Sequence, residues 1–276
     1  MTSQHPLGLF IVCDEELPAR LKAAQALSIP TAQILAPRQR DQAAAERLRQ
    51  QFVHAGLQIS VVFCGFAGES YADIPTVEKT VGLVPPATRQ ARLAEAKEIS
   101  DFAASLSVAA TALHIGFVRP DPGSPAYQEM VQTARALCEH CQANQQRLHL
   151  ETGQETAAEL LQFIKEVDRP NLAVNFDPAN MILYGCGEPL PALKQLGPLV
   201  KSVHCKDAKW AAQPGMDWGQ EVPLGEGDVN IPLFIQTLNE IGYSGPLTIE
   251  REIVGERQLQ DIQKAVDLLH RLQKPK

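Results

Sequence analysis

Strand-length apolar runs alternate with longer amphipathic stretches along the whole 276-residue chain, and this alternation is the feature that most limits its fold. The sequence predicts eight strands, near residues 7–13, 31–36, 57–64, 110–116, 147–151, 172–177, 199–204 and 246–250. Helical patterns separate them, near residues 17–27, 40–55, 86–106, 124–144, 155–167, 188–196, 230–241 and 256–273. Consecutive strand–helix units of this kind predict a closed parallel (β/α)8 barrel, a TIM barrel in the α/β class.

The length of the chain agrees with one barrel. Such a barrel usually needs about 250 residues, so residues 1–276 are expected to form a single domain. An open doubly wound sheet is the competing fold. That fold usually carries a glycine-rich nucleotide-binding turn after its first strand, whereas this chain has Val12-Cys13-Asp14-Glu15 there. The sequence therefore favours the barrel.

The composition excludes several classes of partner. A net charge of −7 and a pI near 5.5 argue against a broad nucleic-acid-binding surface, which needs a basic stripe. No apolar run approaches the roughly 18 residues that span a membrane, and the first residues do not resemble a signal peptide. The six cysteines are scattered, with a lone Cys-x-x-Cys at Cys138 and Cys141, as is typical of reduced thiols. We expect a cytoplasmic protein without nucleic-acid or membrane partners.

Four predicted strands in the second half of the chain end in residues that can bind a metal: Glu151, Asp177, His204 and Glu250. A lone acid at a strand end is usually a helix cap or an ion-pair partner. In a parallel barrel, however, these strand ends open on one face, where the four side chains could converge. Three oxygens and one nitrogen suit Mn²⁺, Mg²⁺, Co²⁺ or Zn²⁺ and leave coordination positions for a substrate. The pattern predicts one divalent ion and a metal-dependent enzyme.

Other polar residues near the same rim are candidate substrate contacts. His114 ends the fourth predicted strand, where it could bind a substrate hydroxyl or be structural. Lys206 follows His204 by two residues and so points to the same side of the strand, towards an anionic group or a barrel ion pair. Arg251 could contact an anion or pair with Glu252.

Two long connections are candidate covers for a pocket. The connection from Lys206 to Val229 carries both tryptophans of the chain, and residues 65–84 form the second candidate. In the glycine-rich part of the first, the sequence favours a turn-and-cap role for Glu226 and Asp228 over a ligand role.

Five short segments resemble the xylose isomerase-like superfamily of TIM barrels, which includes sugar isomerases and epimerases of carbohydrate metabolism. They are Leu150-Glu151-Thr152, Asn175-Phe176-Asp177-Pro178-Ala179-Asn180, Val203-His204-Cys205-Lys206-Asp207, Leu224-Gly225-Glu226-Gly227-Asp228-Val229 and Thr248-Ile249-Glu250-Arg251-Glu252. The His-x-Lys-Asp and Gly-Glu-Gly-Asp segments together are fairly specific to this group. By this resemblance, the four strand-end residues correspond to the metal ligands of the ketose 3-epimerase branch, in which the two glutamates are also the acid–base pair.

The resemblance implies a divalent-metal-dependent sugar isomerase or epimerase that acts on a small sugar or polyol. Glu151 would take a proton from carbon and Glu250 would return it from the other side, through a metal-stabilised cis-enediolate. Asp177 and His204 would only hold the ion. Barrels of this group are often dimers or tetramers, so a homo-oligomer is a further expectation.

Two positions depart from the ketose 3-epimerase pattern. Asn180 stands where that branch has a histidine, and Trp210 stands where it has an arginine. Because both family residues touch substrate, Asn180 and Trp210 are candidate substrate contacts. The resemblance therefore transfers the metal site but not the substrate.

Three alternative functions remain open at this point. An inosose-type dehydratase, a lyase, shares the proton abstraction and then loses a β-hydroxyl. A non-catalytic metal- or sugar-binding barrel is disfavoured because it would not need two opposed carboxylates. An endonuclease IV-type phosphodiesterase needs several more histidine ligands, whereas this acidic chain has seven histidines in all.

Overall fold

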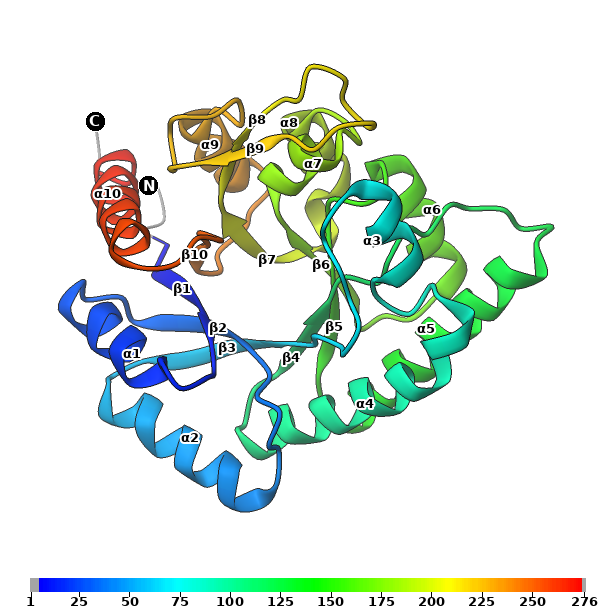
Figure 1. Ribbon diagram of the computed structural model, residues 1–276, viewed down its shortest axis with the longest axis horizontal. Helices are drawn as coiled ribbons and strands as arrows, with labels where there is room; N and C mark the ends of the chain where they lie inside the picture. Colours follow the sequence, from blue (N-terminus) through cyan, green and yellow to red (C-terminus); the bar gives the residue numbers. More distant parts are fainter. Residues whose placement is uncertain (1–4, 275–276) are drawn as a thin grey trace.

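The computed structural model of the protein describes residues 5–274 and shows a closed barrel of eight parallel strands (Figure 1). The barrel strands are β1 (Leu7–Val12), β2 (Thr31–Leu35), β3 (Gln58–Phe63), β4 (Ala110–Leu113), β5 (Arg147–Glu151), β6 (Leu172–Phe176), β7 (Val200–Cys205) and β10 (Leu247–Ile249). Neighbours follow the order of the chain, and pairing of Leu7 with Leu247 closes the barrel. The predicted (β/α)8 fold is confirmed.

Helices cover the outside of the barrel (Figure 1). Eight of them match the predicted helices to within two residues at each end: α1 (Leu17–Ala26), α2 (Gln42–His54), α4 (Pro86–Ser105), α5 (Pro125–Ala143), α6 (Ala157–Val167), α8 (Pro189–Leu196), α9 (Ile231–Glu240) and α10 (Glu256–Leu272). Two short helices, α3 (Ile74–Thr80) and α7 (Pro178–Tyr184), lie in connections on the rim. A single 3₁₀ turn, Gly197–Leu199, precedes β7.

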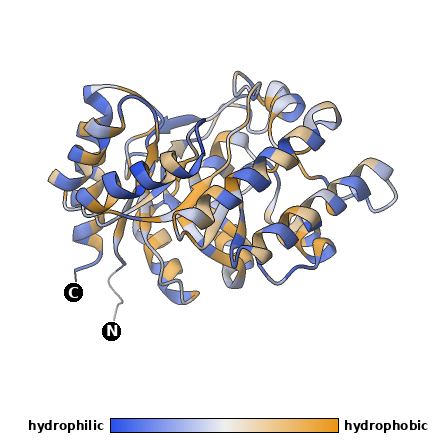
Figure 2. Ribbon diagram, turned by 90° about the horizontal axis from the view of Figure 1, so that it is seen from below, coloured by the Kyte–Doolittle hydropathy of each residue, from blue (hydrophilic) through white to orange (hydrophobic). Residues whose placement is uncertain are grey.

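The sequence explains where these elements begin and what they bury. At the start of α6, Thr156 and Glu159 form a reciprocal capping box that satisfies otherwise free backbone N–H groups. The five residues of β6 are all buried, as expected for a strand with helices outside and packed side chains inside. Apolar side chains lie along the strands and on the inner faces of the helices, so the core sits between the two layers (Figure 2).

The two connections that were expected to cover a pocket contain structure of their own. The connection after β7 forms a small antiparallel ribbon of β8 (Asp207–Lys209) and β9 (Gln220–Val222). The connection after β3 contains α3 and is fixed by Arg92, which donates hydrogen bonds to the carbonyls of Ala67, Thr80 and Gly82. Within residues 5–274, none of the helices has both the length and the apolar character needed to cross a membrane.

Candidate metal centre

Glu151, Asp177, His204 and Glu250 meet at the carboxyl-terminal face of the barrel. Glu151 is the last residue of β5, His204 lies in β7, and Asp177 and Glu250 directly follow β6 and β10. One ligand atom from each of the four residues lies within 4.8 Å of the others. The structure thus brings together the four residues that the sequence proposed as metal ligands, in a buried cluster that could hold a metal ion.

Three carboxylate oxygens surround one imidazole nitrogen. His204 Nδ1 lies 2.8 Å from Glu151 Oε1, 3.2 Å from Glu250 Oε2 and 3.4 Å from Asp177 Oδ2. Despite these short distances, neither His204 Nδ1 nor Asp177 Oδ2 forms a hydrogen bond of acceptable geometry. These unsatisfied atoms lie close enough together to be ligands of one ion.

Gln33 determines which nitrogen of His204 faces these oxygens. Its amide nitrogen lies 3.0 Å from Thr248 Oγ1, so its oxygen faces His204 Nε2 at 2.9 Å and accepts that N–H. Nδ1 is then directed at three carboxylates. Burial lowers the pKa of His204, but these carboxylates outweigh burial and raise it, so Nδ1 can hold either a proton or a metal ion. The donor set therefore fits a divalent ion. Sequence analysis missed Gln33, although a glutamine inside the apolar strand β2 is a signal that could have found it.

Asp177 has two structural roles at once. Its Oδ1 accepts hydrogen bonds from the backbone N–H groups of Ala179 and Asn180 and so caps α7, while its Oδ2 faces the cluster. The helix-cap role and the metal-ligand role considered for this residue are therefore compatible.

A cavity of about 1010 Å³ opens above the cluster. Glu151 and Glu250 line it, together with His114 and Asn180. Asp177 and His204 are fully buried below it and do not belong to the described lining. The four candidate ligands thus divide into two glutamates that reach the cavity and two residues beneath it.

His114 contacts the first of these glutamates. Its Nε2 lies 3.0 Å from Glu151 Oε2. Burial disfavours the charged imidazole, but Glu151 outweighs burial and raises the pKa of His114 to about 9. Burial likewise opposes ionisation of Glu151, and the imidazoles of His114 and His204 overcome it and lower the pKa of this carboxyl. Glu151 is therefore held as a carboxylate.

Lys206 contacts the second glutamate. Its buried Nζ lies 3.1 Å from Glu250 Oε2 and 3.0 Å from Glu252 Oε1. Burial raises the pKa of Glu250, but His204 and Lys206 prevail and lower it to about 2. Lys206 also donates to Asn180 Oδ1 at 3.2 Å, and Asn180 Nδ2 donates to Glu151 Oε1 at 3.3 Å. A chain of side-chain contacts therefore joins the two glutamates through Asn180 and Lys206.

The structure places the remaining two candidates elsewhere. Trp210 packs against the main core, and its backbone N–H donates to Asp228. Arg251 pairs with Glu221 at 3.0 Å and Asp261 at 3.1 Å, beside a separate surface groove. Within the described residues, neither belongs to the lining of the large cavity. The cavity contains instead the other tryptophan, Trp218.

The sequence did not show which of the two tryptophans lines the cavity. Both tryptophans lie in the same connection, and only the folded ribbon of β8 and β9 decides which one faces the cavity. The Trp218 ring packs against Tyr184, with ring centroids 4.6 Å apart.

The glycine-rich turn is held by Asp207. Its carboxylate accepts hydrogen bonds from the backbone N–H groups of Gly225, Gly227 and Val229. A Cβ at Gly227 would lie 2.6 Å from the Ala208 carbonyl oxygen and closer still to the Asp207 carboxylate. Asp207 therefore fixes the turn, and Asp228 within the turn accepts a hydrogen bond from the backbone N–H of Trp210.

Comparison with known proteins identifies the family. Residues 21–272 match the family described as xylose isomerase-like TIM barrel. The chain belongs to this family. The resemblance inferred from the five sequence segments is thereby confirmed.

Three individual proteins illustrate this likeness. A xylose isomerase domain protein from Planctomyces limnophilus is 51% identical, with 98% of each chain covered and a TM-score of 0.95. The uncharacterized protein MJ1311 of Methanocaldococcus jannaschii is 29% identical over 115 residues, which cover 41% of this chain and only 36% of that curated relative. D-psicose 3-epimerase from Clostridium cellulolyticum H10, solved with D-tagatose, is 17% identical, with 98% and 100% of the two chains covered and a TM-score of 0.73.

Other solved structures share this fold at similarly low identity. They include another epimerase, a probable dehydratase and a protein solved with magnesium, at 15–21% identity and TM-scores of 0.68–0.70. At such identities the likeness shows the fold alone.

Proposed function

We propose that this protein is a divalent-metal-dependent isomerase or epimerase of a sugar or a related polyol. One observation carries the proposal. Of the four clustered candidate ligands, only Glu151 and Glu250 also line the cavity. They stand at the two ends of an arc of four neighbouring strands, β5, β6, β7 and β10, so a substrate above the cluster would meet a carboxylate on either side.

Proton transfer at a carbon next to a carbonyl needs a base, an acid and a way to stabilise charge. A divalent ion held by Glu151, Asp177, His204 and Glu250 would stabilise the negative charge that develops on neighbouring substrate oxygens. Mn²⁺, Mg²⁺, Co²⁺ and Zn²⁺ all accept this donor set. Either glutamate could remove the proton, and the other would deliver one to the opposite face, with general acid–base assistance of about 10²–10⁴-fold.

The neighbouring side chains would hold this pair in place. His114 orients Glu151 through its Oε2, and Lys206 orients Glu250 through its Oε2. Asn180 contacts Glu151 and Lys206 and also reaches the cavity, so it could bind a substrate hydroxyl where the ketose 3-epimerase branch has a histidine. Trp210 and Arg251 would act on the substrate only indirectly, through the walls of the cavity.

The described cysteines are all unpaired thiols, which supports the proposal of a reducing, cytoplasmic location. The homo-oligomer remains a prediction from the family resemblance.

Deuterium exchange tests the proposed chemistry. The metal-loaded protein would be incubated in D₂O with ketoses, aldoses and inososes, and incorporation at carbon would be followed by NMR. We expect exchange that chelation abolishes and that Glu151→Gln lowers by at least about 10²-fold. Glu188→Gln, an exposed carboxylate at the start of α8, is the matched control and should retain full exchange.

The outcome also separates the alternative functions. Exchange followed by loss of a hydroxyl would identify a dehydratase in place of an isomerase. Tight metal binding without exchange of any substrate would favour a non-catalytic binding barrel. A protein that binds no divalent ion would contradict the proposal.

A further inference from the structure

The cavity above the metal cluster is larger than a monosaccharide requires. Its volume of about 1010 Å³ lies at the upper limit of the roughly 300–1,000 Å³ that is usual for sites of drug-sized ligands. The polar groups that would hold a sugar gather on one arc of the rim, from β4 through β10, where His114, Asn180 and the two glutamates lie. The rest of the cavity has a different chemical character.

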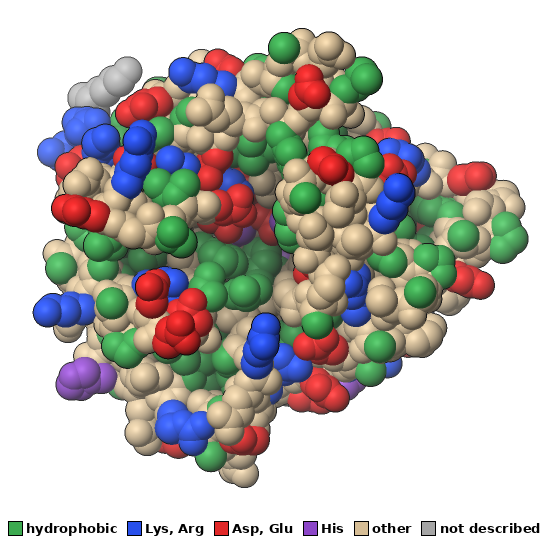
Figure 3. All heavy atoms as spheres, in the orientation of Figure 1, with side chains coloured by type: hydrophobic (Ala, Val, Ile, Leu, Met, Phe, Trp, Pro, Cys, Tyr) green, Lys and Arg blue, Asp and Glu red, His purple; other side chains and the backbone are tan. Residues whose placement is uncertain are grey.

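The wall contributed by the first three strands is apolar. Phe10, Leu35 and Phe63 come from β1, β2 and β3, and Phe66 follows β3. The ring centroids of Phe63 and Phe10 lie 5.3 Å and 5.5 Å from that of His204, so this wall begins directly beside the metal cluster. Figure 3 shows apolar side chains on the floor of the central hollow and carboxylates next to them.

More apolar surface comes from the connections. Leu183 and Tyr184 of α7 line the cavity together with Trp218, whose indole packs on the Tyr184 ring. A monosaccharide could place only one C–H face on this surface and would leave much of it uncovered. A flat hydrophobic group attached to the sugar would cover it.

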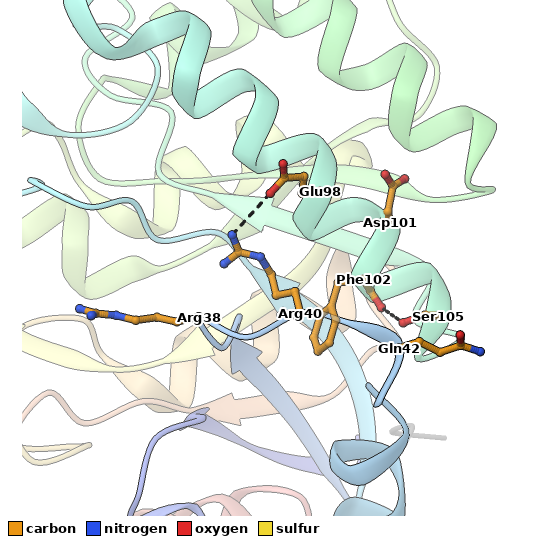
Figure 4. A pocket seen from close by; sticks show the side chains of 7 residues that line it. All are labelled: Arg38, Arg40, Gln42, Glu98, Asp101, Phe102 and Ser105. Atoms are coloured by element: carbon orange, nitrogen blue, oxygen red, sulfur yellow. Dashed lines mark hydrogen bonds and ion pairs between the residues drawn. The ribbon is translucent and has the colours of Figure 1, made fainter. Parts of the chain in front are cut away.

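Charges of both signs surround the cavity. Six carboxylates line it: Glu69, Glu95, Glu151, Glu221, Glu250 and Glu252. Cations other than the arginines of the lining already offset four of them, since His114 contacts Glu151, Lys206 contacts Glu250 and Glu252, and Arg251 pairs with Glu221. Of the arginines, Arg40 already pairs with Glu95 at 3.0 Å and lies 3.8 Å from Glu98. In the hollow of Figure 4, Arg38 points away from the other labelled side chains. The apolar wall, and not the charge of the lining, therefore distinguishes substrates.

We infer that the substrate is a sugar or polyol that carries a flat apolar substituent away from the carbonyl at which the proton is removed, as an aryl glycoside of a keto-sugar does, and that free monosaccharides are poor ligands. This inference rests on the proposed sugar chemistry at the metal cluster and names its substrate class. The polyol part lies against the arc of the two glutamates, and the apolar part lies against Phe10, Leu35 and Phe63.

Matched glycosides test the inference. Binding to the Mn²⁺-loaded protein would be measured by calorimetry for phenyl and methyl glycosides of glucose, galactose, xylose and fructose, which serve as unreactive probes of the apolar wall. Burial of a phenyl ring is expected to make the best phenyl glycoside bind at least about tenfold more tightly than its methyl counterpart.

Two variants locate the effect. Phe10→Ala and Leu35→Ala should each reduce the phenyl-over-methyl ratio severalfold, and Leu35→Ala should do so without a change in Mn²⁺ affinity. Leu233→Ala, an exposed leucine on α9, is the control and should leave the ratio unchanged.

If Mn²⁺ binds normally, a phenyl-over-methyl ratio near one for every pair, or no binding of any glycoside, would overturn this inference alone. An unchanged ratio in both variants would also overturn it. Failure to bind Mn²⁺ would overturn the proposed function and, with it, the inference.

Discussion

Gln33 shows how a single side chain can define a metal site without touching the ion. It accepts the Nε2–H of His204 and so leaves Nδ1 free to face the carboxylates. Partners of this kind typically contribute a factor of about 10–100 to metal affinity. The residue lies on β2, across the barrel from the strands that carry the ligands. The residues next to it in the sequence give no indication of this role.

Replacement of Gln33 by leucine should therefore weaken metal binding. We expect Gln33→Leu to raise the Kd for Mn²⁺ by about 10–100-fold, because His204 loses the partner that fixes its tautomer. Calorimetric titration with Mn²⁺ would measure the change. Gln25→Leu, an exposed glutamine on α1, is the control, and an equal effect in both variants would refute a specific role for Gln33.

Glu155 is a second single residue whose burial should have a measurable effect. It is buried, neither carboxylate oxygen has a hydrogen-bond partner, and burial raises its pKa to about 8. Three titratable groups face it. His114 lowers the pKa of Glu155 and Glu159 raises it, and Glu155 in turn raises the pKa of Cys186. Since the folded pKa exceeds the ordinary value near 4.5, folding favours the protonated acid. The free energy of unfolding should then fall as pH rises from about 4.5 to 8.

Glu155→Gln removes this penalty. The variant should be more stable than the parent by about 2–4 kcal/mol at pH 8, and the difference should shrink towards zero at pH 4.5. Urea unfolding across this pH range would measure it, with the exposed Glu15→Gln as control. A difference that is the same at both ends of the range would show that Glu155 is not titrating as described.

Among the elements, the ribbon of β8 and β9 depends on one close approach between backbones. Gly227 lies where a Cβ would collide with the Asp207 carboxylate and the Ala208 carbonyl. That carboxylate in turn holds the whole glycine turn. The sequence carried the turn signal, but the reason for this particular glycine is a contact between segments about 20 residues apart.

Gly227→Ala should consequently destabilise the protein. We expect a loss of about 1–3 kcal/mol in the free energy of unfolding, since the added methyl group forces the turn away from Asp207. Gly123→Ala, where the nearest atom would be 3.6 Å away, should change stability by no more than about 0.5 kcal/mol. Urea unfolding of both variants checks the contrast, and equal losses would contradict the explanation.

Among the helices, sequence analysis did not predict the two short ones, α3 and α7. The seven residues of α3 and of α7 are too few to repeat an amphipathic pattern. The long helices bury one face against the barrel, and their repeating apolar positions make them visible in the sequence. At the strand ends the differences are small, as in β10, which spans Leu247–Ile249 inside the predicted 246–250.

For the molecule as a whole, metal binding and folding should be coupled. Without a cation, the buried carboxylates of the cluster repel one another, and an ion that binds only the folded barrel stabilises it. Mn²⁺ at about 100 times its Kd should add about 2.7 kcal/mol to the free energy of unfolding, and chelation should remove it. Asp177→Asn keeps an acceptor at the start of α7 but loses a ligand charge, so its stability should hardly respond to Mn²⁺.

Thermal unfolding with and without Mn²⁺ measures this coupling. Asp168→Asn, an exposed residue at the end of α6 in a left-handed conformation that asparagine also adopts, is the matched control. A parent protein whose melting temperature is indifferent to Mn²⁺, or an Asp177→Asn variant that responds like the parent, would argue against the cluster as the binding site.

By itself, the sequence determined the barrel and the four clustered candidate ligands, Glu151, Asp177, His204 and Glu250. These features follow from the local pattern, because apolar runs define strands and parallel closure sends their ends to one face. Only the tertiary structure decided that Gln33 contacts His204, that Trp218 and not Trp210 lines the cavity, and that Arg251 is occupied by Glu221 and Asp261. Such contacts join residues distant in the chain, and their geometry depends on how connections pack against one another, which no local periodicity records.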